Sequence, residues 1–264
     1  MTRHCIRSAP GGREDFESRD RLAIGALCEE DGPPAADPVM KPNIKLAETK
    51  TPDGHRFSLH THDGTFCIRL NGREVMHSSV TSSETLLGDL ACGLLARRPG
   101  SRCLIGGLGL GFTLKSVLEK AGPKVSVHVA ELMPEVVEWN RTFLAGLNGA
   151  LLNDPRTQIL SGDVWNIIAR APLASYDAIL LDIDNGPAGM VQKENSRIYQ
   201  HKGILKIAAA LKTGGRAAIW SSYADRAFQE RLTHAGFEVE VVPAKAYPTA
   251  KRFAYTIYVA DKVD

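Results

Sequence analysis

The chain has 264 residues, of which 44% are apolar and 23% charged, and 32 Lys and Arg against 30 Asp and Glu leave a net charge of +2. This composition is typical of one sizeable globular α/β domain with a small appendage. The near-neutral charge gives no electrostatic reason to expect nucleic acid or an anionic membrane as a partner, and no apolar run reaches the roughly 20 residues of a membrane span.

Residues 1–39 differ from the rest of the chain. They are rich in charges, Gly-Gly and Pro-Pro, show little periodicity, and are expected to form a poorly ordered tail without the apolar core of a secretory signal. An alternative is that Met40 is the natural start. The cysteines lack C-x-x-C spacing and a His cluster, so we expect reduced thiols in a cytoplasmic protein and no metal site. These cysteines are Cys5, Cys28, Cys67, Cys92 and Cys103.

Residues 40–80 are expected to form a small antiparallel sheet. The run HRFSLHTH alternates Phe57 and Leu59 with polar neighbours, and the runs TFCIRL and REVMH follow it. Asp-Gly at 63–64 and Asn-Gly at 71–72 separate these runs, and such dipeptides between alternating segments are strong hairpin signals. The pattern predicts three strands joined by two tight turns.

Residues 81–264 are expected to form the main domain. Residues 81–84, Thr-Ser-Ser-Glu, match a capping box before an apolar helical face, and Pro-Gly at 99–100 ends that helix. Strands and helices then alternate, which predicts a doubly wound, mostly parallel seven-stranded sheet with helices on both faces. The last two strands are too close together for a crossover helix and should form an antiparallel hairpin. The predicted strands are 102–106, 125–131, 157–160, 177–182, 216–222, 236–242 and 253–259, and the predicted helices 112–121, 134–142, 163–170, 197–212 and 225–235.

A glycine-rich turn follows the first strand of this sheet. Gly107, Gly109 and Gly111 form a G-x-G-x-G pattern, in which glycine permits a sharp turn and close approach of a ligand. Such a turn is also common without a ligand. Glu131, 20 residues beyond Gly111 at the end of the second strand, can accept hydrogen bonds from both hydroxyls of a ribose. The alternative role for Glu131 is that of a carboxylate at a helix N-terminus before Pro134.

Acidic residues also follow the third and fourth strands. Asp163 can accept a hydrogen bond from an adenine amino group while Val164 packs on the ring, or Asp163 is only a helix N-cap. After the fourth strand come Asp182, Asp184 and Asn185. Ligands bind outside the carboxyl ends of strands in open α/β sheets, so this cluster indicates a polar substrate, with an amine as one candidate. A structural turn is the alternative.

The order of glycine turn, acid, Asp and acidic loop favours a nucleoside cofactor over NAD. Over residues 55–225 the chain resembles the spermidine synthase-like family, on the segments LNGREVMHSSVTSSE, CLIGGLGLGF, VAELMPEVVEWNR, SGDVWNII, DAILLDIDNGP and NSRIYQHKGI. The resemblance implies a Rossmann-like methyltransferase fold and a cofactor, S-adenosylmethionine or its decarboxylated form. It implies that the three loop glycines contour the cofactor, that Glu131 holds its ribose and that Asp163 and Val164 hold its adenine. Asp182 would face the nucleophilic nitrogen of the substrate as the catalytic residue.

The chain departs from the family pattern where the polyamine would bind. The family carries an Asp-Glu…Tyr-His/Gln-Glu segment in which the Tyr position corresponds to Leu87 and the His/Gln position to Gly88. Leu110 stands where the family's glycine loop has an Asp, and the family's Asp-Ser-Ser-Asp-Pro loop is shortened to residues 182–187. The sequence therefore does not support a diamine site with several acids.

Three functions are compatible with this pattern. We rank methylation of a small polar acceptor first, aminopropyl transfer second and a non-catalytic binding module third. Asp182 would align the nucleophile and assist its deprotonation, and further residues would orient the substrate or form the pocket wall. The small N-terminal sheet resembles a dimer-forming element of the family, so a homodimer is one expectation for an otherwise open oligomeric state. The substrate-binding candidates are Asp184, Asn185, Asn195, Tyr199, Trp220 and Tyr223.

Overall fold

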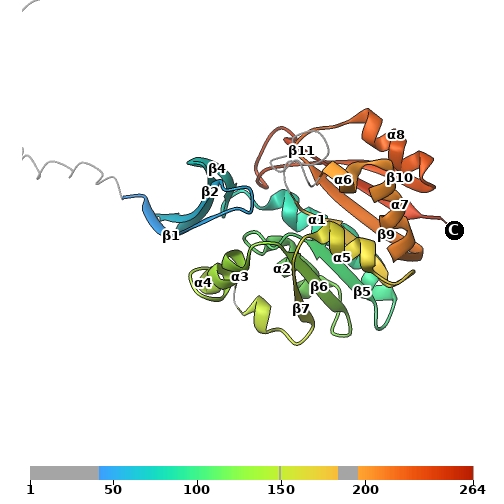
Figure 1. The fold of residues 1–264 in the computed structure, drawn as a ribbon, viewed down its shortest axis with the longest axis horizontal. Helices are drawn as coiled ribbons and strands as arrows, with labels where there is room; N and C mark the ends of the chain where they lie inside the picture. The colour runs from blue at the N-terminus through green and yellow to red at the C-terminus, as the bar shows by residue number, and fades with distance from the viewer. Residues whose placement is uncertain (1–41, 149, 184–195, 264) are drawn as a thin grey trace, which may run out of the picture. The chain divides into compact units, whose positions relative to one another are not determined.

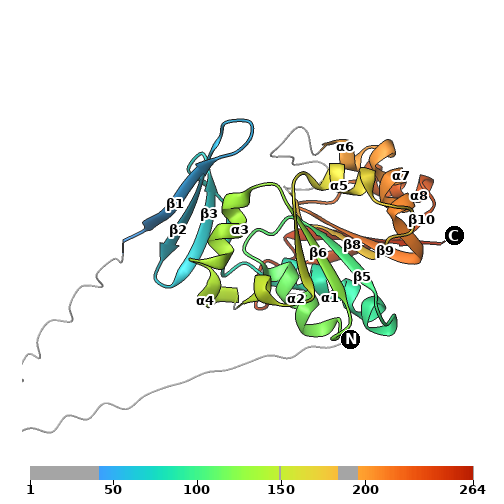
Figure 2. The ribbon, with the colours of Figure 1, turned by 60° about the horizontal axis from the view of Figure 1, so that its bottom comes forward.

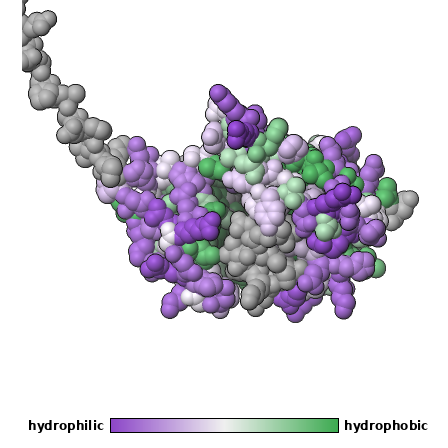
Figure 3. Space-filling view, turned by 90° about the horizontal axis from the view of Figure 1, so that it is seen from above, coloured by the Kyte–Doolittle hydropathy of each residue, from purple (hydrophilic) through white to green (hydrophobic). Residues whose placement is uncertain are grey.

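The computed structural model describes residues 42–148, 150–183 and 196–263. These residues belong to one unit that spans Lys41–Asp264, and the expected tail at 1–39 lies outside them. Cys67, Cys92 and Cys103 are free thiols in the described part of the chain. Over the same residues, no helix is both long enough and apolar enough to cross a membrane. Figure 3 shows hydrophilic residues spread over one face of the molecule and interrupted by smaller apolar patches.

The N-terminal sheet contains four antiparallel strands in the order β1-β2-β3-β4 (Figure 1). Both predicted tight turns form, and their residues Asp63, Gly64, Asn71 and Gly72 all have positive φ, as hairpin turns of this kind require. The sequence prediction missed β1, whose exposed and half-buried residues mix polar and apolar side chains without a clear alternation and which pairs with β2 across the loop at 51–55. The strands are β1 Ile44–Lys50, β2 Arg56–His62, β3 Thr65–Leu70 and β4 Arg73–His77.

The main sheet has seven strands in the order β10-β11-β9-β8-β5-β6-β7. Strands β7, β6, β5, β8 and β9 run parallel, whereas β11 pairs antiparallel with both β9 and β10. The predicted fold class is therefore confirmed, including the terminal hairpin. The strands are β5 Arg102–Gly106, β6 Ser126–Glu131, β7 Thr157–Ser161, β8 Tyr176–Leu181, β9 Leu211–Ser221, β10 Phe237–Ala244 and β11 Tyr255–Lys262.

Helices cover both faces of the main sheet (Figure 2). Successive residues of β8 show why, because Ala178 and Leu180 pack into one apolar core with α1 and α2, while Ile179 and Leu181 pack into the other with α5 and α7. A strand buried on both faces in this way reads as a continuous apolar run. The helices are α1 Ser82–Arg97, α2 Phe112–Lys120, α3 Pro134–Arg141, α4 Ala145–Asn148, α5 Val164–Arg170, α6 Ser196–Tyr199, α7 His201–Ala210 and α8 Arg226–His234, with a 3₁₀ turn at Leu151–Asn153.

Two local predictions are wrong. The helix predicted at 197–212 is divided into α6 and α7, and β9 already begins at Leu211, which pairs with Tyr176 of β8. The expected capping box does not form, because Thr81 makes no side-chain cap hydrogen bond at the start of α1. Instead Ser83 Oγ donates a hydrogen bond to Glu84 Oε2 at 2.6 Å. Glu84 is thereby available to the cavity described next.

Candidate functional site

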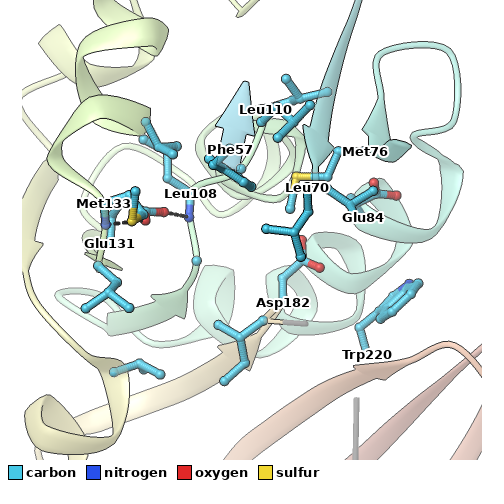
Figure 4. Close-up of a pocket in the computed structure, with 18 of the residues that line it drawn as sticks. Phe57, Leu70, Met76, Glu84, Leu108, Leu110, Glu131, Met133, Asp182 and Trp220 are labelled. Atoms are coloured by element: carbon cyan, nitrogen blue, oxygen red, sulfur yellow. Dashed lines mark hydrogen bonds between the residues drawn. The ribbon is translucent and has the colours of Figure 1, made fainter. Parts of the chain in front are cut away.

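A cavity of about 410 Å³ lies at the carboxyl ends of the parallel strands. Its lining comes from the N-terminal sheet, the start of α1, the glycine loop after β5 and the ends of β6, β8 and β9. Figure 4 shows Leu108, Glu131 and Met133 on one side of it and Glu84, Asp182 and Trp220 on the other. The carboxyl ends of the strands are where open α/β sheets bind ligands, so the cavity occupies the expected position.

The glycine loop brings backbone to the cavity wall where a side chain would not fit. Gly107 has φ +87°, and a Cβ there would lie 2.4 Å from the backbone oxygen of Asp182. Gly109 has φ +50° and also lines the cavity, next to Met76. Gly111 is not among the described lining residues. It is the left-handed N-cap of α2 and packs against Asn148, so its conformation serves the loop itself.

Glu131 is buried at the end of β6 and lines the cavity. Its Oε2 accepts a hydrogen bond from the backbone N–H of Leu108 at 2.9 Å, and its Oε1 accepts one from that of Met133 at 2.8 Å. Burial raises the pKa of Glu131, and these backbone donors oppose the shift. Each carboxylate oxygen can accept more than one hydrogen bond. Glu131 can therefore hold the glycine loop and still accept from two ligand hydroxyls.

Asp163 and Val164 lie together at the start of α5, and both line the cavity. Asp163 is the N-cap of this helix, accepting a hydrogen bond from the backbone N–H of Trp165 at 2.8 Å, and it also pairs with Arg197 at 3.7 Å. The N-cap interpretation is thus confirmed. Contact of Asp163 and Val164 with an adenine ring stays a prediction.

Two carboxyl groups, Glu84 and Asp182, share the opposite side of the cavity. Asp182 Oδ2 accepts a hydrogen bond from Thr113 Oγ1 at 2.8 Å. Burial raises the pKa of Asp182 to about 6. Burial, together with the charge of Asp182, raises the pKa of Glu84 to about 7. The shared cause is burial, which disfavours the ionised form of each carboxyl group, and the like charge of Asp182 adds to it at Glu84.

Sequence reasoning did not assign Glu84 to the site. Its position three residues after Thr81 fitted a capping box, which was a sufficient local explanation. The signal that could have found it is the helical spacing of Glu84 with Leu87 and Gly88, the two positions at which the related family carries polar residues. Residues spaced three and four apart lie on one helix face.

The predicted aromatic wall is only partly present. Trp220 lines the cavity together with Tyr255, and their ring centroids are 4.9 Å apart. Trp220 Nε1 is buried without a hydrogen-bond partner in the described structure. Tyr199 lies instead in the core, where its hydroxyl donates to Ile183 O at 3.1 Å, and half-exposed Tyr223 is not among the described lining residues. The predicted site residues Asp184, Asn185 and Asn195 lie outside the described residues.

The cavity lining is strongly acidic. Its described residues include five carboxylates and no Lys or Arg. Three of these acids, Glu131, Asp163 and Asp182, were expected at the site from the sequence, and two further acids, Glu74 and Glu84, join them. An anionic cavity favours a cationic ligand, since burying like charges without a counter-charge is costly. The five are Glu74, Glu84, Glu131, Asp163 and Asp182.

The three positions that depart from the family pattern have different surroundings. Leu87 is fully buried in the core. A Cβ on Gly88 would lie 2.7 Å from the Cβ and Oγ of Ser116, so this glycine allows α1 to approach α2. Leu110 lines the cavity as an apolar side chain. Leu87 and Gly88 thus serve packing, and only Leu110 changes the chemistry of the cavity wall.

These features define the class of protein. A doubly wound sheet with a terminal antiparallel hairpin, and a glycine loop followed by acids at successive strand ends, is a Rossmann-like methyltransferase fold. The solved structures similar to this chain agree with that class. A spermidine synthase from Thermotoga maritima matches with a TM-score of 0.65 at 18% identity, covering 83% of this chain and 74% of that one. A spermidine synthase in complex with the transition-state analogue AdoDATO matches with a TM-score of 0.64 at 18% identity, covering 83% and 73%.

Curated relatives narrow the resemblance. The chain is 31% identical over 114 residues to a polyamine aminopropyltransferase of Mycobacterium tuberculosis, which covers 42% of this chain and 21% of that protein. It is 31% identical over 118 residues to putrescine N-methyltransferase 1 of Nicotiana tabacum, which covers 44% of this chain and 29% of that protein. The matches thus span less than a third of either relative. No protein-family model matches the chain. The resemblance to the spermidine synthase-like family is confirmed, in the fold of the solved structures and in the sequence of these relatives.

Proposed function

We propose that the chain is a transferase that moves an alkyl group from an adenosyl sulfonium compound to an amine, with methylation by S-adenosylmethionine as the main reading. The observation that carries this proposal is the composition of the cavity. One side presents the glycine loop and Glu131, and the other presents the Glu84 and Asp182 carboxyl pair. The first side offers a hydrogen-bond acceptor and exposed backbone to a nucleoside, and the second offers carboxyl groups to a cationic nitrogen.

The residues of the first side fit an adenosyl group. Glu131 retains acceptor capacity for a ribose, Gly107 and Gly109 leave the wall free of Cβ atoms, and Asp163 and Val164 occupy the end of the next strand. When bound, the cofactor supplies a carbon activated by a sulfonium, which leaves as a neutral thioether and needs little acid catalysis. The protein must therefore mainly position the acceptor and keep water away.

Asp182 is placed to act on the acceptor nitrogen. An aliphatic amine is protonated near neutral pH, and its nitrogen can attack only after it loses that proton. A carboxylate whose pKa lies near the working pH is a more effective base than an ordinary one. Burial raises the pKa of Asp182 toward that range. Thr113 fixes one oxygen of this carboxyl group, which leaves the other for the nitrogen.

Two observations bear on which group is transferred. Leu110 presents an apolar side chain to the cavity where the related aminopropyl enzymes carry an acid in the glycine loop, and this favours methyl transfer. The described lining contains no Lys or Arg to pair with the carboxylate of S-adenosylmethionine, and this favours the decarboxylated cofactor. Aminopropyl transfer is therefore the second candidate. The names of the relatives, aminopropyltransferases and putrescine N-methyltransferases, support both.

Calorimetric titration with S-adenosylmethionine, its decarboxylated form and 5′-methylthioadenosine separates the two. We expect S-adenosylmethionine to bind and to transfer its tritium-labelled methyl group to an aliphatic diamine. Tight binding of only the decarboxylated compound would establish the second candidate instead. Failure of all three compounds to bind would refute both.

The Asp182→Asn variant tests catalysis separately from binding. Asparagine keeps an oxygen that can accept from Thr113, so we expect affinity for 5′-methylthioadenosine within about twofold of wild type. Because general-base assistance contributes about 10²–10⁴-fold, turnover should fall by at least 100-fold. Unchanged turnover would remove Asp182 from the mechanism. A chain that binds the nucleoside but transfers nothing, in any variant, would be a binding module.

A further inference from the structure

Glu84 is an acid in the cavity to which no role was assigned from the sequence, although it lies in the segment 83–89 that corresponds to the family's Asp-Glu…Tyr-His/Gln-Glu run. It lies in the first turn of α1 and lines the cavity with Asp182, Trp220 and Tyr255. Figure 4 places Glu84, Asp182 and Trp220 on the side away from Glu131. Glu84 is therefore separated from the residues that fit the nucleoside.

Local contacts hold Glu84 in this position. Ser83, which is 1% exposed, donates a hydrogen bond from its hydroxyl to Glu84 Oε2. Thr113 Oγ1 lies 2.8 Å from Asp182 Oδ2 and 3.4 Å from the backbone oxygen of Glu84. This hydroxyl thus links the turn that carries Glu84 to the neighbouring acid. Gly88, in the next turn, allows α1 to lie close to α2 at Ser116.

Among the described residues, no cation faces the Glu84 carboxyl group. The polar groups that face it are the Asp182 carboxyl, the Ser83 hydroxyl and the Tyr255 phenol, whose pKa is raised by burial and by the Glu84 charge. Burial and Asp182 raise the pKa of Glu84 in turn. A cation placed between the two carboxyl groups would reverse both effects, because an opposite charge favours the ionised acid.

An aromatic wall adjoins the two acids. Trp220 and Tyr255 pack with their rings inclined by 43°, and both line the cavity beside Glu84. Aromatic faces attract ammonium groups and exclude water from the ion pairs that they cover. Two acids beside two aromatic rings are suited to an alkylammonium group and poorly suited to a carboxylate or phosphate.

We propose that Glu84 is a specificity-determining residue that binds the ammonium group of an aliphatic amine acceptor, with Asp182 beside it and Trp220 and Tyr255 covering the ion pair. This inference rests on the proposed function, which requires an amine in the cavity. The bound ammonium ionises both acids, so the proton that they hold in the free protein is released to solvent. Amine binding near pH 7 should then be coupled to proton release.

Calorimetry on the full chain saturated with 5′-methylthioadenosine tests the proposal, with 1,4-diaminobutane as the probe. Titrations at pH 7 in phosphate and in Tris measure the released protons, because the two buffers differ in ionisation enthalpy. We expect wild type to release between half a proton and one proton per bound amine. Glu84→Gln should weaken amine binding at least 10-fold and abolish most of the release, while affinity for 5′-methylthioadenosine stays within about twofold.

Two variants serve as controls. Glu119→Gln removes the same charge from an exposed position on α2 outside the described lining and should behave as wild type. Glu84→Asp keeps the carboxylate and should retain proton release even if affinity falls, which a merely structural role of Glu84 would not produce. It also provides a second variant should Glu84→Gln fail to fold.

Three outcomes overturn the proposal. One is wild-type amine affinity and proton release in Glu84→Gln, and another is loss of proton release in Glu84→Asp. The third is failure of wild type to bind the amine although it binds the nucleoside, which leaves the nucleoside part of the proposed function standing. Failure to bind either compound removes the proposed function as well.

Discussion

Replacement of Glu131 by Gln would test the nucleoside side of the cavity. We expect two separate effects, one on the stability of the glycine loop and one on ligand affinity. The Glu131 carboxylate accepts hydrogen bonds from the backbone N–H groups of Leu108 and Met133, and we propose that it also accepts hydrogen bonds from a ribose. Loss of affinity in a Glu131 variant therefore reports both on the loop and on the ligand. A change in the ligand separates the two contributions.

The expected losses of stability and of ligand affinity follow from the number of hydrogen bonds that Glu131 accepts. A glutamine has one acceptor oxygen, so one of the two buried backbone N–H groups loses its partner at a cost of about 1–3 kcal/mol in the free energy of unfolding. A hydrogen bond to the charged carboxylate contributes about 1.5–3 kcal/mol to binding. At about 1.4 kcal/mol for each factor of ten, removal of one ribose hydroxyl should weaken binding to wild type by roughly 10–150-fold.

The assay compares 5′-methylthioadenosine with its 2′-deoxy analogue on wild type and on Glu131→Gln, by calorimetry, with urea denaturation of both proteins. We expect the penalty for the missing hydroxyl to be large in wild type and to shrink to a few-fold in the variant, because the variant lacks the charged acceptor with either ligand. Such a double-mutant cycle cancels the loop effect. An equal penalty in both proteins would show that Glu131 does not contact the ribose.

Two further predictions concern stability. The pKa values of Glu84 and Asp182 are raised in the folded state, so the folded protein holds more protons than the unfolded chain between about pH 4 and pH 7, and the wild-type free energy of unfolding falls as the pH rises through that window. Glu84→Gln lacks much of this loss. From pH 4 to pH 8, the free energy of unfolding of the variant should rise by about 1–2 kcal/mol relative to that of wild type, as measured by urea denaturation. A difference between the two proteins that stays constant with pH would contradict the raised pKa values. Gly107→Ala should cost about 2–4 kcal/mol, because its positive φ and the backbone of Asp182 both oppose a Cβ. Gly122→Ala has a similar φ in open space and should cost only about 1–2 kcal/mol, so equal losses would argue against the close approach at Gly107.

The fold could be predicted where periodicity and turn chemistry agreed. Apolar strands alternating with helices specified the doubly wound sheet, and Asp-Gly and Asn-Gly specified the hairpins, because each signal is local and only a few residues long. Strand β1 was missed because its side chains do not alternate clearly, although Pro-Asp-Gly at 52–54 marks the turn that leads to β2. The break between α6 and α7 was missed because the apolar spacing continues through it, while the pairing of Leu211 with Tyr176 ends the helix earlier.

The site could be predicted in part. Gly107, Gly109, Glu131, Asp163, Val164, Asp182 and Trp220 all line one cavity, because the carboxyl ends of parallel strands meet at one edge of the sheet. Tyr199 and Tyr223 were predicted in the pocket wall, and neither is among the described lining residues. Their actual positions depend on the packing of α6 and on the exposed loop after β9, which no local pattern encodes.

The position of Glu84 explains how the cavity is acidic although Leu87 and Gly88 stand where the similar family carries polar residues. At Leu87 and Gly88 of α1, the side chains that the family uses are replaced by a core leucine and by a glycine that brings α1 against Ser116. The same helix face still reaches the cavity one turn earlier, at Glu84, where Ser83 orients the carboxyl group. This acid lines the same side of the cavity as Asp182, and in the proposed function the two carboxyl groups concentrate negative charge near the nitrogen to be alkylated. Such an arrangement favours recognition of one ammonium group over recognition of both ends of a long diamine.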